Sequence, residues 1–237
     1  MMNKDNIRAS TEIQETLANL EVDLLGVVAL QDIEGGRLAE QARDLLPETS
    51  SIVVIAMEVY PEFIGLTTPE MVAGAPNFND LYSRHIDHLT GRLDRAAYAI
   101  ARASHRAGLK ALPLPSRRTP TNLRTLTSVL SYKHAAEAAG LGKIGMSSLI
   151  ITDRFGPRIR LGICLTEASL NSTADDSPGA CRYCNICVAK CPAHALGYPG
   201  EGESYVIDKF ACRTYADSSG GCSECVKRCP VASAKYA

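Results

Sequence analysis

The sequence predicts an α+β protein in two parts, a domain of mixed helices and strands over residues 1–170 and a cysteine-rich module over residues 171–237. Three observations support this division. Residues 51–60 form a continuous β-branched run, which is typical of a buried central strand. Residues 79–108 place Leu, Ile and Ala at helical spacing, which indicates one long helix. Eight of the nine cysteines lie after residue 180, which indicates a module built around them.

The other elements before residue 80 follow from apolar patterning and from glycine and proline. Residues 10–20 predict a short helix capped by Ser10 or Thr11, and residues 22–30 fit a strand. A second helix is predicted to start at Gly35-Gly36 and to end before Pro47. Residues 61–78 hold three prolines and predict a loop.

The second half of the domain predicts shorter elements that lead into the cysteines. In chain order they are a strand over 110–114, a helix over 131–139, a strand over 148–152, a turn at 153–157, a strand over 158–167 and a linker over 168–180. The last two strands are predicted to pair as a hairpin that feeds the module.

Composition limits the classes of function. The net charge of −1 offers no basic surface for general nucleic-acid binding. No apolar run approaches the roughly 18 residues that a membrane span needs. The first residues show neither an apolar leader nor a twin-arginine pair, so we expect a cytoplasmic protein.

The cysteine spacing carries the chemistry. The first run is Cys181-x2-Cys184-x2-Cys187-x3-Cys191-Pro192, and the second is Cys222-x2-Cys225-x3-Cys229-Pro230, with Cys212 upstream. In the first spacing, three cysteines hold one [4Fe-4S] cluster and the fourth crosses to the other cluster. We therefore predict that Cys181, Cys184, Cys187 and Cys229 bind one cluster. The second cluster is predicted to use Cys191, Cys212, Cys222 and Cys225.

Other uses of these residues are weaker. Disulfides need an oxidising compartment, and zinc sites do not require the x2-x2-x3-Pro spacing. Cys164 lies in an apolar run and predicts a buried core thiol. His85 and His88 are spaced as a metal pair, but with no third ligand in view we favour solvated or hydrogen-bonded histidines.

A glycine-rich segment, Gly140-Leu-Gly-Lys-Ile-Gly145, precedes the module. A dinucleotide fingerprint opens a helix after a strand, whereas these glycines close a helix and precede a strand. They either let the backbone approach a flat ligand or cap the helix, and the residues alone leave both readings open.

This segment resembles a known family. Residues 135–150 are similar to the Ala-Glu-x-Ala-Gly-Leu-Gly-x-Ile-Gly-Lys-Asn-x-x-Leu-Ile segment of epoxyqueuosine reductases, and residues 155–162 to their Tyr/Phe-Gly-Ser-x-x-x-Leu-Gly. Reductive dehalogenases share the arrangement. The resemblance spans roughly residues 80–237. It implies a nitroreductase-like α/β domain that holds base-off cobalamin, followed by a two-[4Fe-4S] ferredoxin-like domain. The residues implied in cobalamin binding are Gly140, Leu141, Gly142, Lys143, Ile144, Gly145, Met146, Ser147 and Ser148.

The chain also departs from the family pattern. Epoxyqueuosine reductases carry an acid upstream of this segment, and residues 123–131 contain none. Met146-Ser147 replaces their Lys-Asn, and we expect the C-terminal helical repeats to be missing. Tyr132 and His134 are the nearest candidates for proton delivery, with exposed first-turn residues as the alternative.

The leading hypothesis is therefore an iron–sulfur oxidoreductase whose clusters pass electrons to bound cobalamin, for reduction of a small-molecule substrate or of a partner corrinoid protein. The alternative is an electron-transfer protein without cobalamin, whose first domain docks a partner or holds flavin. A tRNA-modifying epoxyqueuosine reductase is less favoured because the acid is missing. The expected electron donor is a ferredoxin or flavodoxin, and homodimer formation is left open.

Overall fold

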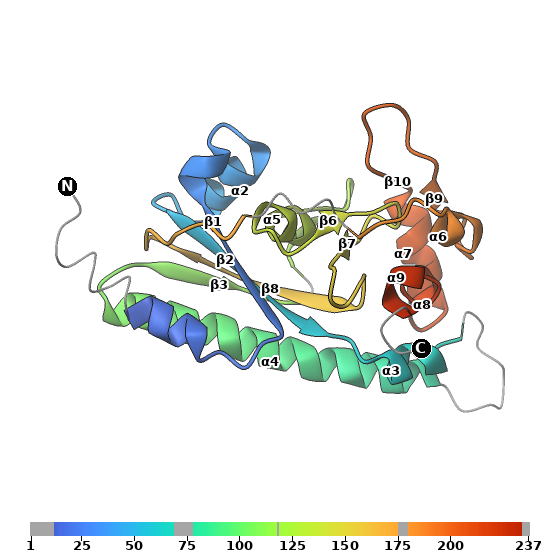
Figure 1. The fold of residues 1–237 in the computed structure, drawn as a ribbon, viewed down its shortest axis with the longest axis horizontal. Helices are drawn as coiled ribbons and strands as arrows, with labels where there is room; N and C mark the ends of the chain where they lie inside the picture. The colour runs from blue at the N-terminus through green and yellow to red at the C-terminus, as the bar shows by residue number, and fades with distance from the viewer. Residues whose placement is uncertain (1–11, 69–77, 118, 175–179, 234–237) are drawn as a thin grey trace. The chain divides into compact units, whose positions relative to one another are not determined.

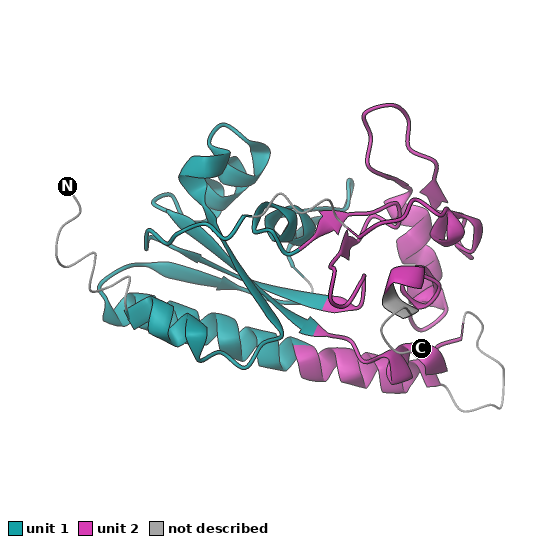
Figure 2. Ribbon diagram, in the orientation of Figure 1, with its two compact units in different colours: residues 1–57, 90–141, 160–176 teal, residues 58–89, 142–159, 177–237 magenta. Residues whose placement is uncertain are grey.

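The computed structural model describes residues 12–68, 78–117, 119–174 and 180–233. Packing divides the chain into two compact units, coloured in Figure 2. The first unit comprises residues 1–57, 90–141 and 160–176, and the second comprises residues 58–89, 142–159 and 177–237. These units are defined by spatial packing and interleave along the chain. The predicted domain boundary at residue 170 stays a prediction.

A four-stranded sheet forms the core of the first unit. Its order is β1 (Leu24–Ala29), β2 (Ser51–Glu58), β8 (Ile159–Thr166) and β3 (Ala111–Leu114), with β1 antiparallel to β2 and β3 antiparallel to β8. β2 and β8 are internal strands, so their side chains are covered on both faces. Residues 52–56 are fully buried, which confirms the predicted central strand.

Helices flank this sheet. Residues 90–106 of α4 (Phe78–Arg106) run along one face, while α2 (Arg37–Leu45) and α5 (Tyr132–Ala138) lie on the other (Figure 1). Two glycines in the strands let the helices approach the sheet closely. A Cβ on Gly162 of β8 would stand 3.2 Å from the Cβ of Leu93 in α4. A Cβ on Gly26 of β1 would stand 2.7 Å from the carbonyl oxygen of Ala139, which follows α5. These contacts explain glycine inside two strands.

Most predicted elements are confirmed, with small shifts at their ends. Residues 12–18 are helical, while the predicted capping residues lie outside the described chain. The remaining short elements of the first unit are η1 (Leu30–Ile33), β4 (Thr121–Asn122) and β5 (Thr127–Ser128).

Two predictions about local structure are wrong. The predicted loop at 61–78 begins with a helix, α3 (Pro61–Leu66), because proline suits the first turn of a helix and Ile64 is buried; residues 69–77 lie outside the described chain. The predicted hairpin does not form either. β7 (Ile150–Ile151) pairs with β6 (Lys143–Ile144), and β8 joins the central sheet. Residues 162–166 are all buried, as an internal strand requires.

The cysteine-rich segment of the second unit consists of short elements. They are α6 (Ile186–Ala189), β9 (Leu196–Gly197), β10 (Val206–Ile207), α7 (Lys209–Ser218), α8 (Glu224–Lys227) and α9 (Pro230–Ser233). Asp208 caps α7 by accepting the backbone N–H groups of Phe210 and Ala211. No helix within the described ranges is long and apolar enough to cross a membrane.

Side-chain hydrogen bonds tie α8 to α3 inside the second unit. The Lys227 ammonium donates to the carbonyl oxygens of Gly65 at 3.0 Å and Thr67 at 2.7 Å. The hydroxyls of Thr67 and Ser223 lie 2.6 Å apart and are buried. The second cysteine run is therefore held against the end of α3, where helix carbonyls lack partners within the helix.

Candidate metal centre

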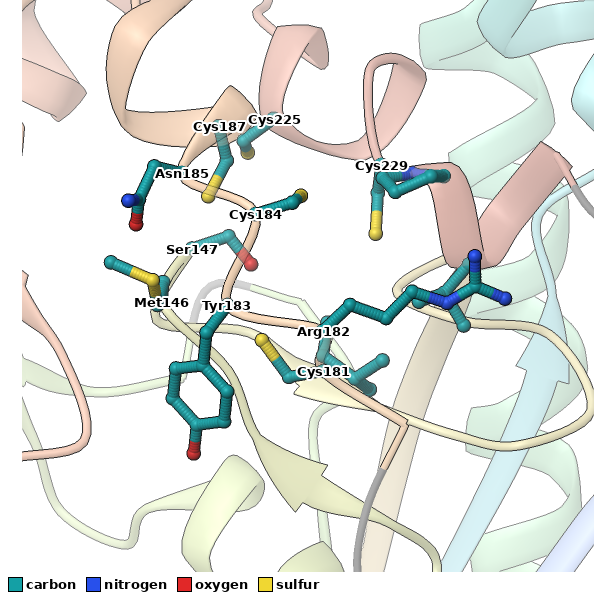
Figure 3. Close-up of a pocket in the computed structure, with 13 residues that line it drawn as sticks. Met146, Ser147, Cys181, Arg182, Tyr183, Cys184, Asn185, Cys187, Cys225 and Cys229 are labelled. Atoms are coloured by element: carbon teal, nitrogen blue, oxygen red, sulfur yellow. The ribbon is translucent and has the colours of Figure 1, made fainter.

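Cysteines from both runs meet in one recess of the second unit. The recess is lined by Cys181, Cys184, Cys187, Cys225 and Cys229, together with Met146 and Ser147 (Figure 3). It includes all four cysteines predicted for the first cluster, and we call these four the first thiol group. Cys229 reaches the recess from the second run, as the spacing rule expects. The assignment of iron ligands stays a prediction.

The backbone of the first run is shaped to enclose a ligand. Tyr183 and Asn185 take left-handed conformations, with φ of +50° and +62°. A left-handed residue beside right-handed ones turns successive backbone N–H groups to one side, and such nests occur at iron–sulfur sites. Burial raises the pKa of Cys187, while hydrogen bonds from the backbone N–H groups of Val188 and Cys187 oppose that rise. The loop can thus donate hydrogen bonds to thiolate sulfur.

We call the other four cysteines of the two runs and their upstream neighbour, Cys191, Cys212, Cys222 and Cys225, the second thiol group. Burial raises the pKa of Cys212 and of Cys222, and the negative charge of Cys191 adds to both shifts. The Ala195 N–H donates to the Cys191 sulfur at 3.3 Å. Mutual repulsion among neighbouring thiolates means that this group needs a bound cation to hold its charge.

Cys225 lies between the two groups. Burial raises its pKa to about 12, and the charges of Cys222 and Cys212 contribute more than that of Cys187. It also lines the recess of the first group. We place Cys225 in the second thiol group because its strongest electrostatic neighbours belong there.

The donor set fits a cluster with several irons. In the described part of the chain, no three His, Cys, Asp or Glu side chains converge on a point that one metal ion could occupy. A cubane needs no such point, because each of its four thiolates binds a different iron. Two groups of four thiolates, which are soft donors, match two [4Fe-4S] clusters in number and chemistry.

Contacts within the protein explain why each of the three positions 140, 142 and 145 is a glycine. Gly140, at φ +74°, ends α5. The Gly140 N–H donates to the Glu137 carbonyl oxygen, and the Leu141 N–H donates to the Ala136 carbonyl oxygen, as at many helix ends. A Cβ on Gly142 would stand 2.3 Å from the Ile151 carbonyl oxygen. One on Gly145 would stand 3.0 Å from the Cys181 sulfur. The protein's own atoms fill the space beside Gly142 and Gly145, so these two glycines do not form an open cradle for a flat ligand.

The turn between β6 and β7 faces the thiols. Its backbone is closed by bonds from the Gly145 N–H to Leu149 and from the Ser148 N–H to Gly145, with Ser148 at φ +61°. Met146 and Ser147 at its tip are buried and line the recess. Sequence reasoning assigned both residues to cobalamin and missed their contact with the cysteines, because no local pattern links the two segments. The predicted contact of residues 140–148 with cobalamin stays a prediction.

The two candidates for proton delivery lie in the first unit, whereas residues 142–148 and the eight cysteines after residue 180 lie in the second. The Tyr132 hydroxyl donates to the Pro115 carbonyl oxygen at 2.8 Å, and burial raises its pKa to about 12. His134 is exposed, and its Nδ1 lies 2.6 Å from the Ser131 hydroxyl. Their catalytic role stays a prediction.

The remaining candidates have structural roles. His85 accepts the Tyr60 backbone N–H at its Nε2 and stacks on Phe63 with ring centres 4.2 Å apart. His88 is exposed. His85 is therefore the hydrogen-bonded histidine favoured by the sequence. Cys164 is fully buried and its pKa is raised to about 12, as expected for a core thiol.

Comparison with known proteins places this arrangement among two groups of enzymes. No protein-family model matches the chain. An epoxyqueuosine reductase of Synechocystis is 27% identical over 183 residues, which cover 74% of this chain and 54% of the relative. One from Gloeobacter violaceus is 37% identical over 89 residues, covering 38% of this chain and 26% of the relative. A tetrachloroethene reductive dehalogenase of Desulfitobacterium hafniense is 31% identical over 117 residues, covering 40% and 21%.

Solved structures of both groups share the fold. A catabolic reductive dehalogenase matches with a TM-score of 0.69 at 17% identity, over 93% of this chain and 31% of its own length. An epoxyqueuosine reductase matches with a TM-score of 0.58 at 20% identity, over 97% of this chain and 67% of its own length. Another matching structure is described as a reductive dehalogenase that performs B12-dependent dehalogenation. The chain spans about half, or less, of the curated relatives it matches. It is a homologue of the epoxyqueuosine reductases and the reductive dehalogenases, and it shares their mixed helix and sheet fold.

Proposed function

We propose that this chain is an electron-transfer protein that carries two [4Fe-4S] clusters in a ferredoxin-like module. The observation that carries the proposal is that Cys229 of the second run lines the same recess as Cys181, Cys184 and Cys187 of the first run. Each bound cluster would supply reversible one-electron transfer. The protein would contribute thiolate ligands, backbone N–H groups aimed at sulfur, and burial.

We further propose that the electrons go to a cobalamin-type acceptor, held by a nitroreductase-like first domain or by a partner corrinoid protein. The support is homology to redox enzymes, one of them described as B12-dependent. The filled spaces beside Gly142 and Gly145 give this second part no support. An electron donor of the ferredoxin or flavodoxin type would supply the module.

Anaerobic reconstitution tests the first part of the proposal. The protein is loaded with iron and sulfide, desalted, and measured for iron, acid-labile sulfide and EPR after reduction. We expect about eight irons per chain and two interacting reduced [4Fe-4S] signals. About one tightly bound zinc per thiol group, in place of iron, would contradict the proposal.

A binding experiment tests the acceptor. Hydroxocobalamin is added to the loaded protein, and the visible spectrum is recorded after gel filtration. Co-elution of the corrinoid with the protein supports an internal cobalamin site. Loss of all corrinoid on the column would exclude tight binding by this chain and leave the alternative, an electron-transfer protein without bound cobalamin.

A further inference from the structure

The surroundings of the two thiol groups differ in charge and in hydrogen-bond donors. Among the described residues that line the recess of the first group, none carries a carboxylate and Arg182 alone is a cation. The second group has two acidic residues beside its cysteines: Glu224 lies between Cys222 and Cys225 in the chain, and the Asp208 carbonyl oxygen accepts the Cys212 backbone N–H at 3.1 Å. The two sites are therefore electrostatically unequal.

Ser147 supplies a hydroxyl at the first site. Its side chain is 7% exposed and, in Figure 3, points into the space surrounded by the labelled thiols. No other residue of the described chain forms a hydrogen bond with this hydroxyl, and its neighbours in the recess include thiols. A buried hydroxyl tends to find an acceptor, and cluster or cysteine sulfur is the acceptor at hand.

Glu224 supplies a buried negative charge at the second site. The residue is 6% exposed and lies between Cys222 and Cys225 in the chain. Its Oε2 accepts the Arg228 Nε–H at 3.1 Å, but the Arg228 side chain is 52% exposed and so partly screened by water. Burial strengthens the effect of the carboxylate on any charge nearby.

We propose that Ser147 and Glu224 set the two clusters at different reduction potentials, with the cluster of the first thiol group the higher. Reduction adds one negative charge to a cluster. A hydrogen bond to sulfur favours that reduced form, and a neighbouring carboxylate disfavours it, so the two residues act in opposite directions. This inference rests on the proposed two-cluster function.

The inequality gives internal electron transfer a direction. An electron from an external one-electron donor protein would move from the cluster of the second thiol group, which is thereby oxidised, to the cluster of the first, which is reduced. No bond is made or broken and no proton is required. Electrons would therefore collect at the recess beside Met146 and Ser147.

An EPR-monitored redox titration of the reconstituted protein tests the inference, with dithionite as reductant. Ser147→Ala is expected to shift the more positive of the two transitions to a more negative potential, and Ser147→Thr, which keeps the hydroxyl, to restore it. Glu224→Gln keeps the shape and a polar oxygen without the charge, and is expected to shift the more negative transition upward. Glu201→Gln, an exposed charge change on the β9–β10 connection, is the control and should move neither.

The outcomes separate this inference from the proposed function. The tuning roles are overturned if Ser147→Ala and Glu224→Gln shift the potential of the same transition, or if neither shifts a potential more than Glu201→Gln does. The proposal of two clusters would survive either result. If iron and sulfide analysis finds fewer than two clusters per chain, the proposed function fails and the inference fails with it. A loss of signal in Ser147→Ala that Ser147→Thr does not restore would make Ser147 a structural residue and also overturn its tuning role.

Discussion

Cys181 occupies the space beside Gly145: a methyl group at Gly145 would stand 3.0 Å from the Cys181 sulfur and 3.2 Å from its Cβ, and 2.8 Å from the Ile151 Cγ1. The turn between β6 and β7 and the first cysteine run therefore fit together only without a side chain at this position. A glycine that the sequence offers as a ligand cradle instead makes room for a thiol.

The first prediction follows from this contact. Gly145→Ala should displace Cys181 and remove the cluster of the first thiol group, lowering iron from about eight to about four per chain. Gly91→Ala in α4 is the control, because its new methyl group would meet only the end of the Arg95 side chain, at 3.6 Å. Full iron content in Gly145→Ala would show that the recess adapts and that the contact does not matter.

The second prediction concerns the cysteine of each run that is predicted to bind the cluster of the other run. Cys191→Ala should damage the cluster of Cys222 and Cys225 more than the cluster of its own run, because the fourth cysteine of such a run crosses to the other cluster. EPR of the reduced protein distinguishes the two losses. Selective loss of the Cys181 cluster would contradict the proposed ligand sets.

The cysteine chemistry and the fold were predictable to different degrees. The spacing of the cysteines predicts their grouping, because iron ligation constrains it directly, and the β-branched run at 51–60 predicts β2. The turn that carries Ser147 was not predictable in the same way, since strands of two residues have little local signature. Contact between Gly145 and Cys181 joins distant segments, so only the folded chain reveals it.

The link between α8 and α3 gives the third prediction. Lys227→Met keeps the aliphatic stem but removes the donor to the carbonyls of Gly65 and Thr67, and should lower the free energy of unfolding by about 2 kcal/mol. Lys209→Met, at an exposed position, is the control. Urea denaturation followed by circular dichroism measures both. Equal stabilities would mean that water replaces the lysine without loss.

His85 gives the fourth prediction, a dependence of stability on pH. Burial, aided by the charge of His88, lowers the pKa of His85 below its ordinary 6.5, so the folded state favours the neutral ring that accepts the Tyr60 N–H. This contribution is complete above pH 6.5, the unfolded value, and is lost as the pH falls from there through the lower folded value. His85→Gln should flatten the fall in melting temperature between pH 7.5 and about 5.5. His88→Gln, the exposed control, should keep most of the fall in melting temperature. An unchanged fall in His85→Gln would show that His85 is not the group responsible for the pH dependence.

The buried ion pair between Arg158 and Glu58 gives the last prediction. Arg158 is 3% exposed, and its Nη1 also approaches the Val59 carbonyl oxygen at 3.4 Å. Removing one partner leaves an uncompensated charge in the interior, so Arg158→Met or Glu58→Gln should each lower the free energy of unfolding by about 3–5 kcal/mol. The double variant should lose less than the sum of the two, because neither charge is then left alone. Arg84→Met, which breaks the exposed pair with Asp80, should leave the urea midpoint unchanged. Strictly additive losses at Arg158 and Glu58 would show that the two side chains stabilise the second unit separately and not as a pair.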